Sequence, residues 1–248
     1  MPTKQMFIEN YSPIDNDKIS FTRQQGSEFA KQVANDFNPL HDIDAKRFCV
    51  PGDLLFSVII AKSGLHKQMT FNFSGMVSEN NTLTFPQEIN KHAEIKDEKG
   101  KTCLSVCTTG EKTHNAKMID TLTQAYVDFS GLTFPDILVK LMLENKVMIN
   151  PARPMIMYQS MSIDLQTLTA ESVTLQLTKT SLTTEGKRGD AWLEFDLLSN
   201  GIIIGQGKKH MLLSGLRAYE QASIDIMVNQ YRQSKNSYQA EVTLELNE

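Results

Sequence analysis

Residues 54–61 read LLFSVIIA, and this apolar run determines the architecture that we predict for the chain. Its apolar side chains surround the helix on nearly every side, so such a helix has to be buried by other elements. The run begins near Pro51-Gly52-Asp53 and ends before Gly64, a residue typical of helix ends. We therefore predict a central helix covered by a sheet.

Segments with strand-like composition follow this helix in two sets. Turn signals separate them, the strongest being Asn200-Gly201. Between the sets, the spacing of Met118 to Phe129 predicts an amphipathic helix closed by Gly131, and Pro135 opens another. The predicted strands are 70–77, 82–89, 93–97 and 102–113 in the first set, and 155–165, 172–183, 191–198 and 202–213 in the second.

The order of these elements is repeated. An amphipathic helix, a more buried helix and four strands occur at about residues 26–113 and again at 116–213. A helix followed by several antiparallel strands is an α+β arrangement, with the sheet curved around the helix. We expect two units that pair their sheets into one pseudo-dimer. Their predicted bounds are 1–115 and 116–235, the second ending in a helix near 218–232, and an acidic tail follows at 236–248.

Upstream of the central helix, Phe29, Val33 and Phe37 recur every four residues and predict a short helix with Ser27 as its N-cap. Asn38-Pro39 should end that helix, because a proline disfavours helical geometry in the residue before it. The end of the helix therefore coincides with the segment DFNPLH, residues 36–41.

This segment combines an acid, an amide and an imidazole. Asp36 and His41, if held close together, can move protons in both directions near neutral pH. The alternative is a proline-terminated helix with a surface histidine, which explains Asn38-Pro39 but not the coincidence of all four residue types. We favour a site that is active or was once active.

The pattern Asp-x-Asn-Pro-x-His before a buried helix resembles the MaoC-like (R)-specific enoyl-CoA hydratases. Arg47-Phe48 before the helix and FNFSGMV at residues 71–77 after it extend the resemblance. It implies a hot-dog fold, in which a long antiparallel sheet wraps a central helix. The second half is similar to the degenerate second unit of double hot-dog members, so the whole chain is expected to be a double hot-dog.

The resemblance also implies an activity, a lyase that adds water to a trans-2-enoyl thioester. Asp36 and His41 would hold the water, and Asn38 would fix the loop or the water. The thioester oxygen would meet backbone N–H groups at the start of the central helix, where free N–H groups and the helix dipole stabilise negative charge. The substrate-binding residues would be Gly52, Asp53, Leu54 and Phe56.

One position departs from that family, which usually has a His-Gly pair where this chain has Gly52-Asp53. A carboxylate facing the substrate would oppose the stabilisation of an oxyanion. As a first-turn residue facing solvent, it would only help the helix. The departure leaves two alternatives open: a non-catalytic protein that binds acyl-CoA or serves as a scaffold or sensor, and an acyl-CoA thioesterase, since this fold hosts several activities.

Composition and charge exclude some of the remaining classes of function. The net charge is -4, with no basic run, so nucleic-acid binding has little electrostatic support. The N-terminal residues Met1 to Gln5 lack the pattern of a signal peptide, and no apolar run is long enough to span a bilayer. We expect a soluble, cytoplasmic protein with reduced thiols, monomeric or homodimeric. Its partner would be an acyl-CoA or acyl-carrier-protein thioester.

Several other residues have a simpler interpretation. The histidines other than His41 lack metal-ligand spacing, so neither a metal site nor a cofactor other than the coenzyme A of the substrate is predicted. The cations of Lys208-Lys209-His210 and of Lys187-Arg188 are interpreted as exposed at the ends of strands, with contact to coenzyme A phosphates as the alternative. Met155, Met157 and Met161 should share one face of a strand and pack in the core, with an acyl pocket as the alternative.

Overall fold

The central helix forms as predicted. In the computed structural model, which describes residues 7–11 and 17–245 and side chains as far as 240, α2 spans Gly52–Ser63. Gly64 caps its end at a φ of 87°, a left-handed conformation that glycine adopts without strain. Almost every residue of α2 is buried, which agrees with its all-round apolar sequence.

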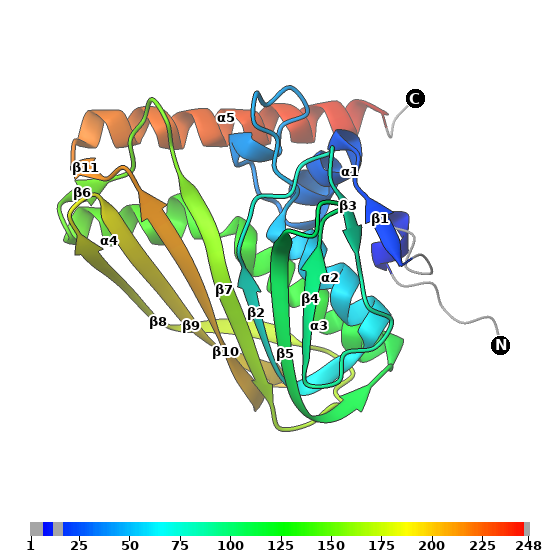
Figure 1. Ribbon diagram of the computed structural model, residues 1–248. Helices are drawn as coiled ribbons and strands as arrows, with labels where there is room; N and C mark the ends of the chain where they lie inside the picture. Colours follow the sequence, from blue (N-terminus) through cyan, green and yellow to red (C-terminus); the bar gives the residue numbers. More distant parts are fainter. Residues whose placement is uncertain (1–6, 12–16, 246–248) are drawn as a thin grey trace.

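The strands form one antiparallel sheet with the order β1-β3-β4-β5-β2-β7-β10-β9-β8 (Figure 1). A second, two-stranded sheet pairs β6 with β11. The bounds of the strands are β1 Lys18–Ser20, β2 Leu65–Phe73, β3 Thr82–Thr84, β4 His92–Lys96, β5 Thr102–Thr113, β6 Val147–Met148, β7 Ile156–Leu165, β8 Thr174–Glu185, β9 Arg188–Ser199, β10 Ile202–Ser214 and β11 Arg217–Ala218.

The large sheet joins the two repeated halves through its middle strands. Five residue pairs between β2 and β7 run from Gln68 opposite Asp164 to Asn72 opposite Ser160. Strands of the first half lie on one side of this junction, and strands of the second half lie on the other. The expected α+β class and the pairing of two helix-backed sheets, the double hot-dog arrangement, are therefore confirmed.

The helices α2, α3 and α4 lie against one face of the sheet, and α5 crosses its upper edge beside the first helix of the chain (Figure 1). Phe56 of α2 links the layers, because its ring packs against Phe71 of β2 and Tyr126 of α3. The helical segments are α1 Arg23–Glu28, α3 Ala116–Gly131, α4 Leu138–Glu144 and α5 Gln221–Glu245, with short turns at Phe7–Asn10, Phe29–Val33, Pro39–His41 and Thr133–Ile137.

The helix before residues 36–41 differs from the prediction. Thr22, not Ser27, is its N-cap, because the Thr22 side chain and Gln25 form a reciprocal capping box. Ser27 lies buried inside α1. The chain then widens into a π-helical turn at Phe29–Val33, so Phe37 lies beyond the helix although it is buried as its spacing suggested.

Other boundaries shift at the ends of elements. β2 begins at Leu65, directly after the glycine cap, and β3 is shorter than expected. The helix α5 continues to Glu245 instead of ending near residue 232. No helix among the described residues has the length and apolar character needed to cross a bilayer. Met1 to Gln5, which bear on the signal peptide, lie outside the described residues.

Candidate active site

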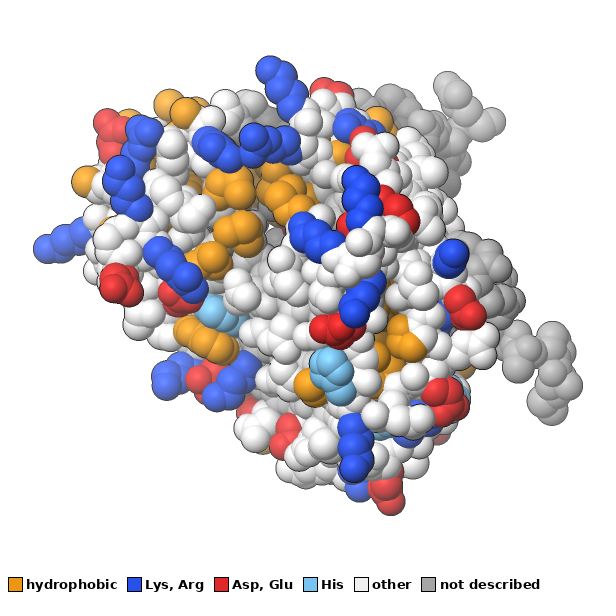
Figure 2. Space-filling model, viewed as in Figure 1, with side chains coloured by type: hydrophobic (Ala, Val, Ile, Leu, Met, Phe, Trp, Pro, Cys, Tyr) orange, Lys and Arg blue, Asp and Glu red, His pale blue; other side chains and the backbone are white. Residues whose placement is uncertain are grey.

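A cavity of about 390 Å³ opens where residues 34–41 meet the start of α2. Figure 2 shows hydrophobic side chains gathered on the upper part of the viewed face, with Lys and Arg side chains around them. The cavity is walled mainly by apolar side chains, and it also reaches four acidic or basic ones. The apolar side chains include Phe73, Met76, Met155, Met157, Met211 and Met227, and the acidic or basic ones are Asp36, His41, Asp53 and Lys209.

Two side chains fold the segment back on itself at the cavity. Asn35 reverses the chain at a φ of 50°, and the Asp36 N–H then donates to the Ala30 carbonyl. The Asp36 carboxylate accepts the Asn38 N–H at 3.0 Å. The Asn38 side chain in turn accepts the Leu40 N–H at 3.1 Å and caps the turn Pro39–His41. These are the local bonds that Asp and Asn favour in turns, so Asn38 fixes the loop.

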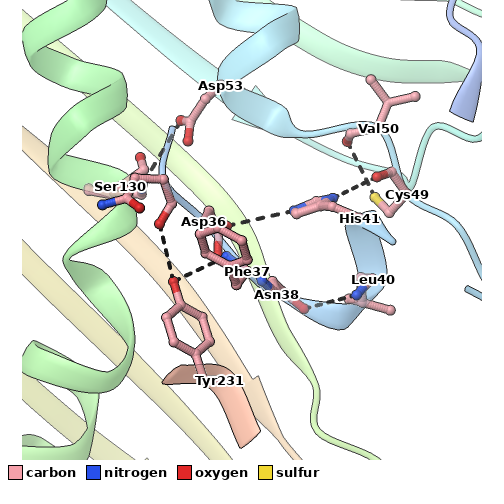
Figure 3. Close-up of polar contacts among 12 residues, drawn as sticks. Asp36, Phe37, Asn38, Leu40, His41, Cys49, Val50, Asp53, Ser130 and Tyr231 are labelled. Atoms are coloured by element: carbon pink, nitrogen blue, oxygen red, sulfur yellow. Dashed lines mark hydrogen bonds and ion pairs between the residues drawn. The ribbon is translucent and has the colours of Figure 1, made fainter. Parts of the chain in front are cut away.

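The imidazole of His41 is oriented by the backbone. Its Nδ1 lies 2.7 Å from the Cys49 carbonyl oxygen, which can only accept, so Nδ1 carries the proton. The other nitrogen, Nε2, then faces Asp36, at 3.8 Å from Oδ2 (Figure 3). The structure therefore brings together the acid and the imidazole that the sequence singled out.

The surroundings of Asp36 favour its protonated form. Burial is the largest cause and raises the pKa of the Asp36 carboxyl, and the nearby Asp53 adds to this. His41, the Asn38 N–H and Lys209 oppose the rise without cancelling it. A carboxylate with a raised pKa is a stronger base than an exposed one, as a general base requires.

A tyrosine from the far end of the chain holds this segment. The hydroxyl of Tyr231, on α5, accepts the Phe37 N–H at 3.2 Å and lies 3.4 Å from the Asn35 carbonyl, to which it donates (Figure 3). The Phe37 ring packs edge-on against the Tyr231 ring. Burial, together with the charge of Asp36, raises the pKa of Tyr231. Tyr231 therefore fixes the backbone on both sides of Asp36.

A second charged pair lies deeper, between α2 and β10. Asp53 is 8% exposed and Lys209 is 4% exposed, with 3.9 Å between Asp53 Oδ1 and Lys209 Nζ. The ammonium donates to the Ser130 hydroxyl of α3 and lies 4.4 Å from the centre of the Tyr158 ring. Burial lowers the pKa of Lys209, while Asp53 and Asp36 counteract this. Asp53 thus faces the cavity and not solvent.

The start of α2 is not open in the way the hydratase resemblance implies. A Cβ on Gly52 would lie 2.6 Å from Tyr158 and 3.2 Å from Phe73, whose rings stack at 4.5 Å. These rings cover the backbone that was expected to meet the thioester oxygen. Gly52 and Asp53 do line the cavity, whereas Leu54 and Phe56 are fully buried in the core and do not.

Three residues of the site were missed or misread in the sequence. Lys209 was interpreted as an exposed cation, yet it is buried, and Tyr158 and Tyr231 were not singled out. The signal for Lys209 is the alternation along β10, which places it on the same face as Met211 and Leu213. Met155 and Met157 line the cavity, while Met161 is buried in the core.

Among the side chains described, those of residues 7–11 and 17–240, no three His, Cys, Asp or Glu are grouped so that they could hold a metal ion. Cys103 and Cys107 both lie on β5, and they and Cys49 are free thiols.

Comparison with known proteins gives one family and a set of similar structures. The model of a family described as "Protein of unknown function (DUF3581)" matches residues 6–222. No curated protein sequence matches significantly. A tesB protein of Mycobacterium avium subspecies paratuberculosis is 8% identical, at a TM-score of 0.42 over 66% of this chain and 87% of that one.

Two further structures are of the same kind. The acyl-CoA thioesterase II TesB2 of Mycobacterium marinum is 7% identical, with a TM-score of 0.41 over 68% of this chain and 91% of that one. A protein of Thermobifida fusca named as a candidate thioesterase II is 10% identical, with a TM-score of 0.44 over 86% and 99%.

These findings correct the expected reaction class. The similar structures from Mycobacterium marinum and Thermobifida fusca are named as thioesterases, which are hydrolases, so the expectation of a lyase is wrong. The hot-dog part of the resemblance holds, whereas its assignment to the MaoC-like hydratases is not supported. The buried Asp53 and the rings over Gly52 occupy the place of the oxyanion site that the hydratase resemblance implies.

Proposed function

The chain belongs to the DUF3581 family, and we propose that it hydrolyses acyl thioesters. The observation that carries the proposal is the Asp36–His41 pair on the wall of a largely apolar cavity. An apolar cavity with a few convergent polar groups suits a small-molecule acyl chain. The substrate would be an acyl thioester of coenzyme A or of an acyl carrier protein.

The acid and the imidazole would activate a water molecule. The distance of 3.8 Å between Asp36 Oδ2 and His41 Nε2 exceeds a direct hydrogen bond, so both groups can contact one water beside them. The pair takes a proton from this water while its oxygen bonds to the thioester carbonyl carbon. The carbon–sulfur bond then breaks, and the departing thiolate receives the proton, leaving a free acid and a thiol.

The remaining groups would position the substrate. The carbonyl oxygen becomes negative as the water adds, and the buried Lys209 ammonium is the cation nearest to Asp36 among those lining the cavity. A positive charge in a dry site stabilises such an oxyanion more than it would in water. Asn38 and Tyr231 would act through Asp36 as positioning residues.

The test is release of free thiol from acyl-CoA thioesters of two to twelve carbons, with and without a hydroxyl group on the acyl chain. The folded protein should release thiol from at least one of them. Asp36→Asn and His41→Gln should each lower the rate by roughly 100-fold or more, the usual contribution of an acid–base group. Asp42→Asn is the control, since Asp42 lies on the same loop and pairs with Lys31 at 3.0 Å. No thiol release across the series would refute the proposal.

A second candidate is a protein that binds acyl thioesters without reaction. The Tyr158 and Phe73 rings over Gly52 favour it, because they cover the backbone at the start of α2. In that case acyl-CoA would bind in calorimetry, no thiol would appear, and Asp36→Asn would leave the affinity unchanged.

A further inference from the structure

We propose that Lys209 and Asp53 form a subsite for a hydroxyl group on the acyl chain, so that hydroxylated acyl thioesters are the preferred ligands. This inference rests on the proposed function, since it names the substrate class of the same cavity. The evidence for it is that these two buried side chains have polar atoms without hydrogen-bond partners.

The pair has hydrogen-bonding capacity to spare. Asp53 Oδ1 is inaccessible to solvent and has no hydrogen-bond partner, and the 3.9 Å that separates it from Lys209 Nζ is too long for a hydrogen bond. The ammonium has three N–H donors, and Ser130 accepts one of them. Both side chains line the cavity, and rotation of the Asp53 carboxylate about χ2, a torsion with a broad energy well, would bring its unpaired oxygen to a ligand there.

Two more hydroxyl groups at the same cavity also lack a hydrogen-bond partner. Thr133 Oγ1 and the Tyr158 hydroxyl are buried without a hydrogen-bond partner, and both residues line the cavity. A buried donor or acceptor without a partner is unfavourable. A purely hydrocarbon ligand would leave these groups unsatisfied, whereas a ligand hydroxyl could supply a missing partner.

The charges of the pair select a hydroxyl among oxygen groups. A hydroxyl donates one hydrogen bond and accepts others. It can therefore donate to Asp53 and accept from Lys209 at the same time. A ketone oxygen could only accept, so Asp53 Oδ1 would stay unsatisfied. A carboxylate would meet Lys209 favourably but would be repelled by Asp53.

The experiment measures binding separately from turnover. The ligands are coenzyme A derivatives in which a methylene separates the sulfur from the carbonyl, so that they cannot be hydrolysed. One carries a saturated four-carbon acyl group, and the others carry one hydroxyl or one ketone on it. We expect the best hydroxyl derivative to bind at least tenfold more tightly than the saturated one and than the ketones, in calorimetry on the full chain.

Two variants test whether Lys209 and Asp53 cause the tighter binding of the hydroxyl derivative. The double variant Lys209→Met/Asp53→Leu removes both charges at similar volume, so no buried charge is left unpaired, and it should abolish the preference. Lys208→Met is the matched control, because Lys208 is exposed on the opposite face of β10 and pairs with Glu194. It should keep the preference. Circular dichroism checks that each variant is folded.

The outcomes separate the two proposals. Selective binding of the hydroxyl derivative without thiol release from any acyl-CoA would support this subsite and refute hydrolysis. Thiol release with equal or tighter binding of the saturated derivative would do the reverse. A preference that survives the double variant would also overturn the inference. If the double variant unfolds, Lys209→Gln, which keeps a donor but no charge, should reduce the preference, and no reduction would overturn the inference.

Discussion

The Asp36 carboxyl lies in surroundings that oppose its ionisation. Its pKa is raised, chiefly by burial, so the folded chain holds this proton more tightly than the unfolded chain does. The contribution to folding is therefore most favourable below the unfolded pKa of about 3.9 and declines as the pH rises through the folded pKa. At neutral pH the ionised group costs stability, as catalytic groups often do.

Asp36→Asn should separate stability from activity. The amide keeps the oxygen that accepts the Asn38 N–H but cannot ionise. We expect thiol release to fall by about 100-fold or more while the variant unfolds at higher urea concentration than the parent at pH 7. The gain should shrink as the pH falls toward 4, because the unfolded parent carboxyl then also takes up its proton. An equal gain at both pH values would contradict this account of Asp36.

At this scale the sequence singled out Asp36, Asn38 and His41, which the structure brings together, and it singled out Asp53 but missed its partner Lys209. Asp36, Asn38 and His41 are close in sequence and bonded locally, so their types and spacing carried the information. Lys209 and Asp53 meet only because β10 and α2 pack together, and a lysine beside another lysine suggests a solvated surface. Phe56 was assigned to the substrate, but its packing on Phe71 and Tyr126 places it in the core.

The end of helix α3 supports the loop that carries Asp36. A Cβ on Gly131 would lie 2.2 Å from the Ala34 carbonyl oxygen and 2.8 Å from that of Asn35. No rotation of a side chain can relieve contacts with backbone atoms. The close approach of α3 to this turn therefore requires glycine at this position.

Gly131→Ala should displace the turn and with it Asp36. Overpacking of this kind costs about 1 to 3 kcal/mol in stability. We expect activity to fall more than the stability loss alone would explain, because the carboxylate moves relative to His41. Asp128→Ala, at an exposed position of the same helix, is the control. Parent-like kinetics in Gly131→Ala would show that the turn tolerates the shift.

Helix α5 supports the same loop from the other side. Tyr231→Phe keeps the ring contacts but removes the hydroxyl that serves Phe37 and Asn35. We expect a loss of about 1 to 2 kcal/mol in the free energy of unfolding, since a buried N–H is left unpaired, and a lower kcat with little change in KM. Tyr238→Phe removes a more exposed hydrogen bond from Gln32 and should change neither. Similar effects of both changes would argue against a specific role for Tyr231.

Elements were predictable where local signals suffice. β5 was predicted with the bounds it has, and Asn200-Gly201 forms the expected turn with positive φ at both residues. The first helix failed because its stripe of Phe29, Val33 and Phe37 passes through a π-helical turn and beyond it. The spacing predicted correctly that Phe29 and Phe37 are buried. They are buried by tertiary packing, however, and not because one continuous helix carries both.

Across the described residues, the two halves of the chain share one large sheet and one hydrophobic core. The β2–β7 ladder and the contact of Phe56 with Tyr126 cross between the two halves of the chain. Neither half completes its buried surface alone. The proposed units 1–115 and 116–235 should therefore unfold together, although their sequence order is that of a duplicated unit.

A destabilising substitution in one half of the chain should also lower the stability of the other half. The only tryptophan, Trp192, lies on β9 in the second half. Phe56→Ala in the first half should cost about 3 to 5 kcal/mol. We expect Trp192 fluorescence and circular dichroism to shift to the same lower urea concentration, in one transition. If the Trp192 fluorescence transition kept the urea concentration of the parent, the two halves would unfold independently.

The bonds from Tyr231 to residues 35–37 also bear on how the protein is made. The two ends of the Phe37–Tyr231 bond are 194 positions apart in sequence. A ribosome releases the acid, the amide and the imidazole well before it releases the hydroxyl that holds them. A partly synthesised chain that stops short of Tyr231 therefore carries these groups without the hydrogen bonds that fix the backbone around them. The local geometry of residues 35–37 is completed only after α5 has been synthesised and has docked.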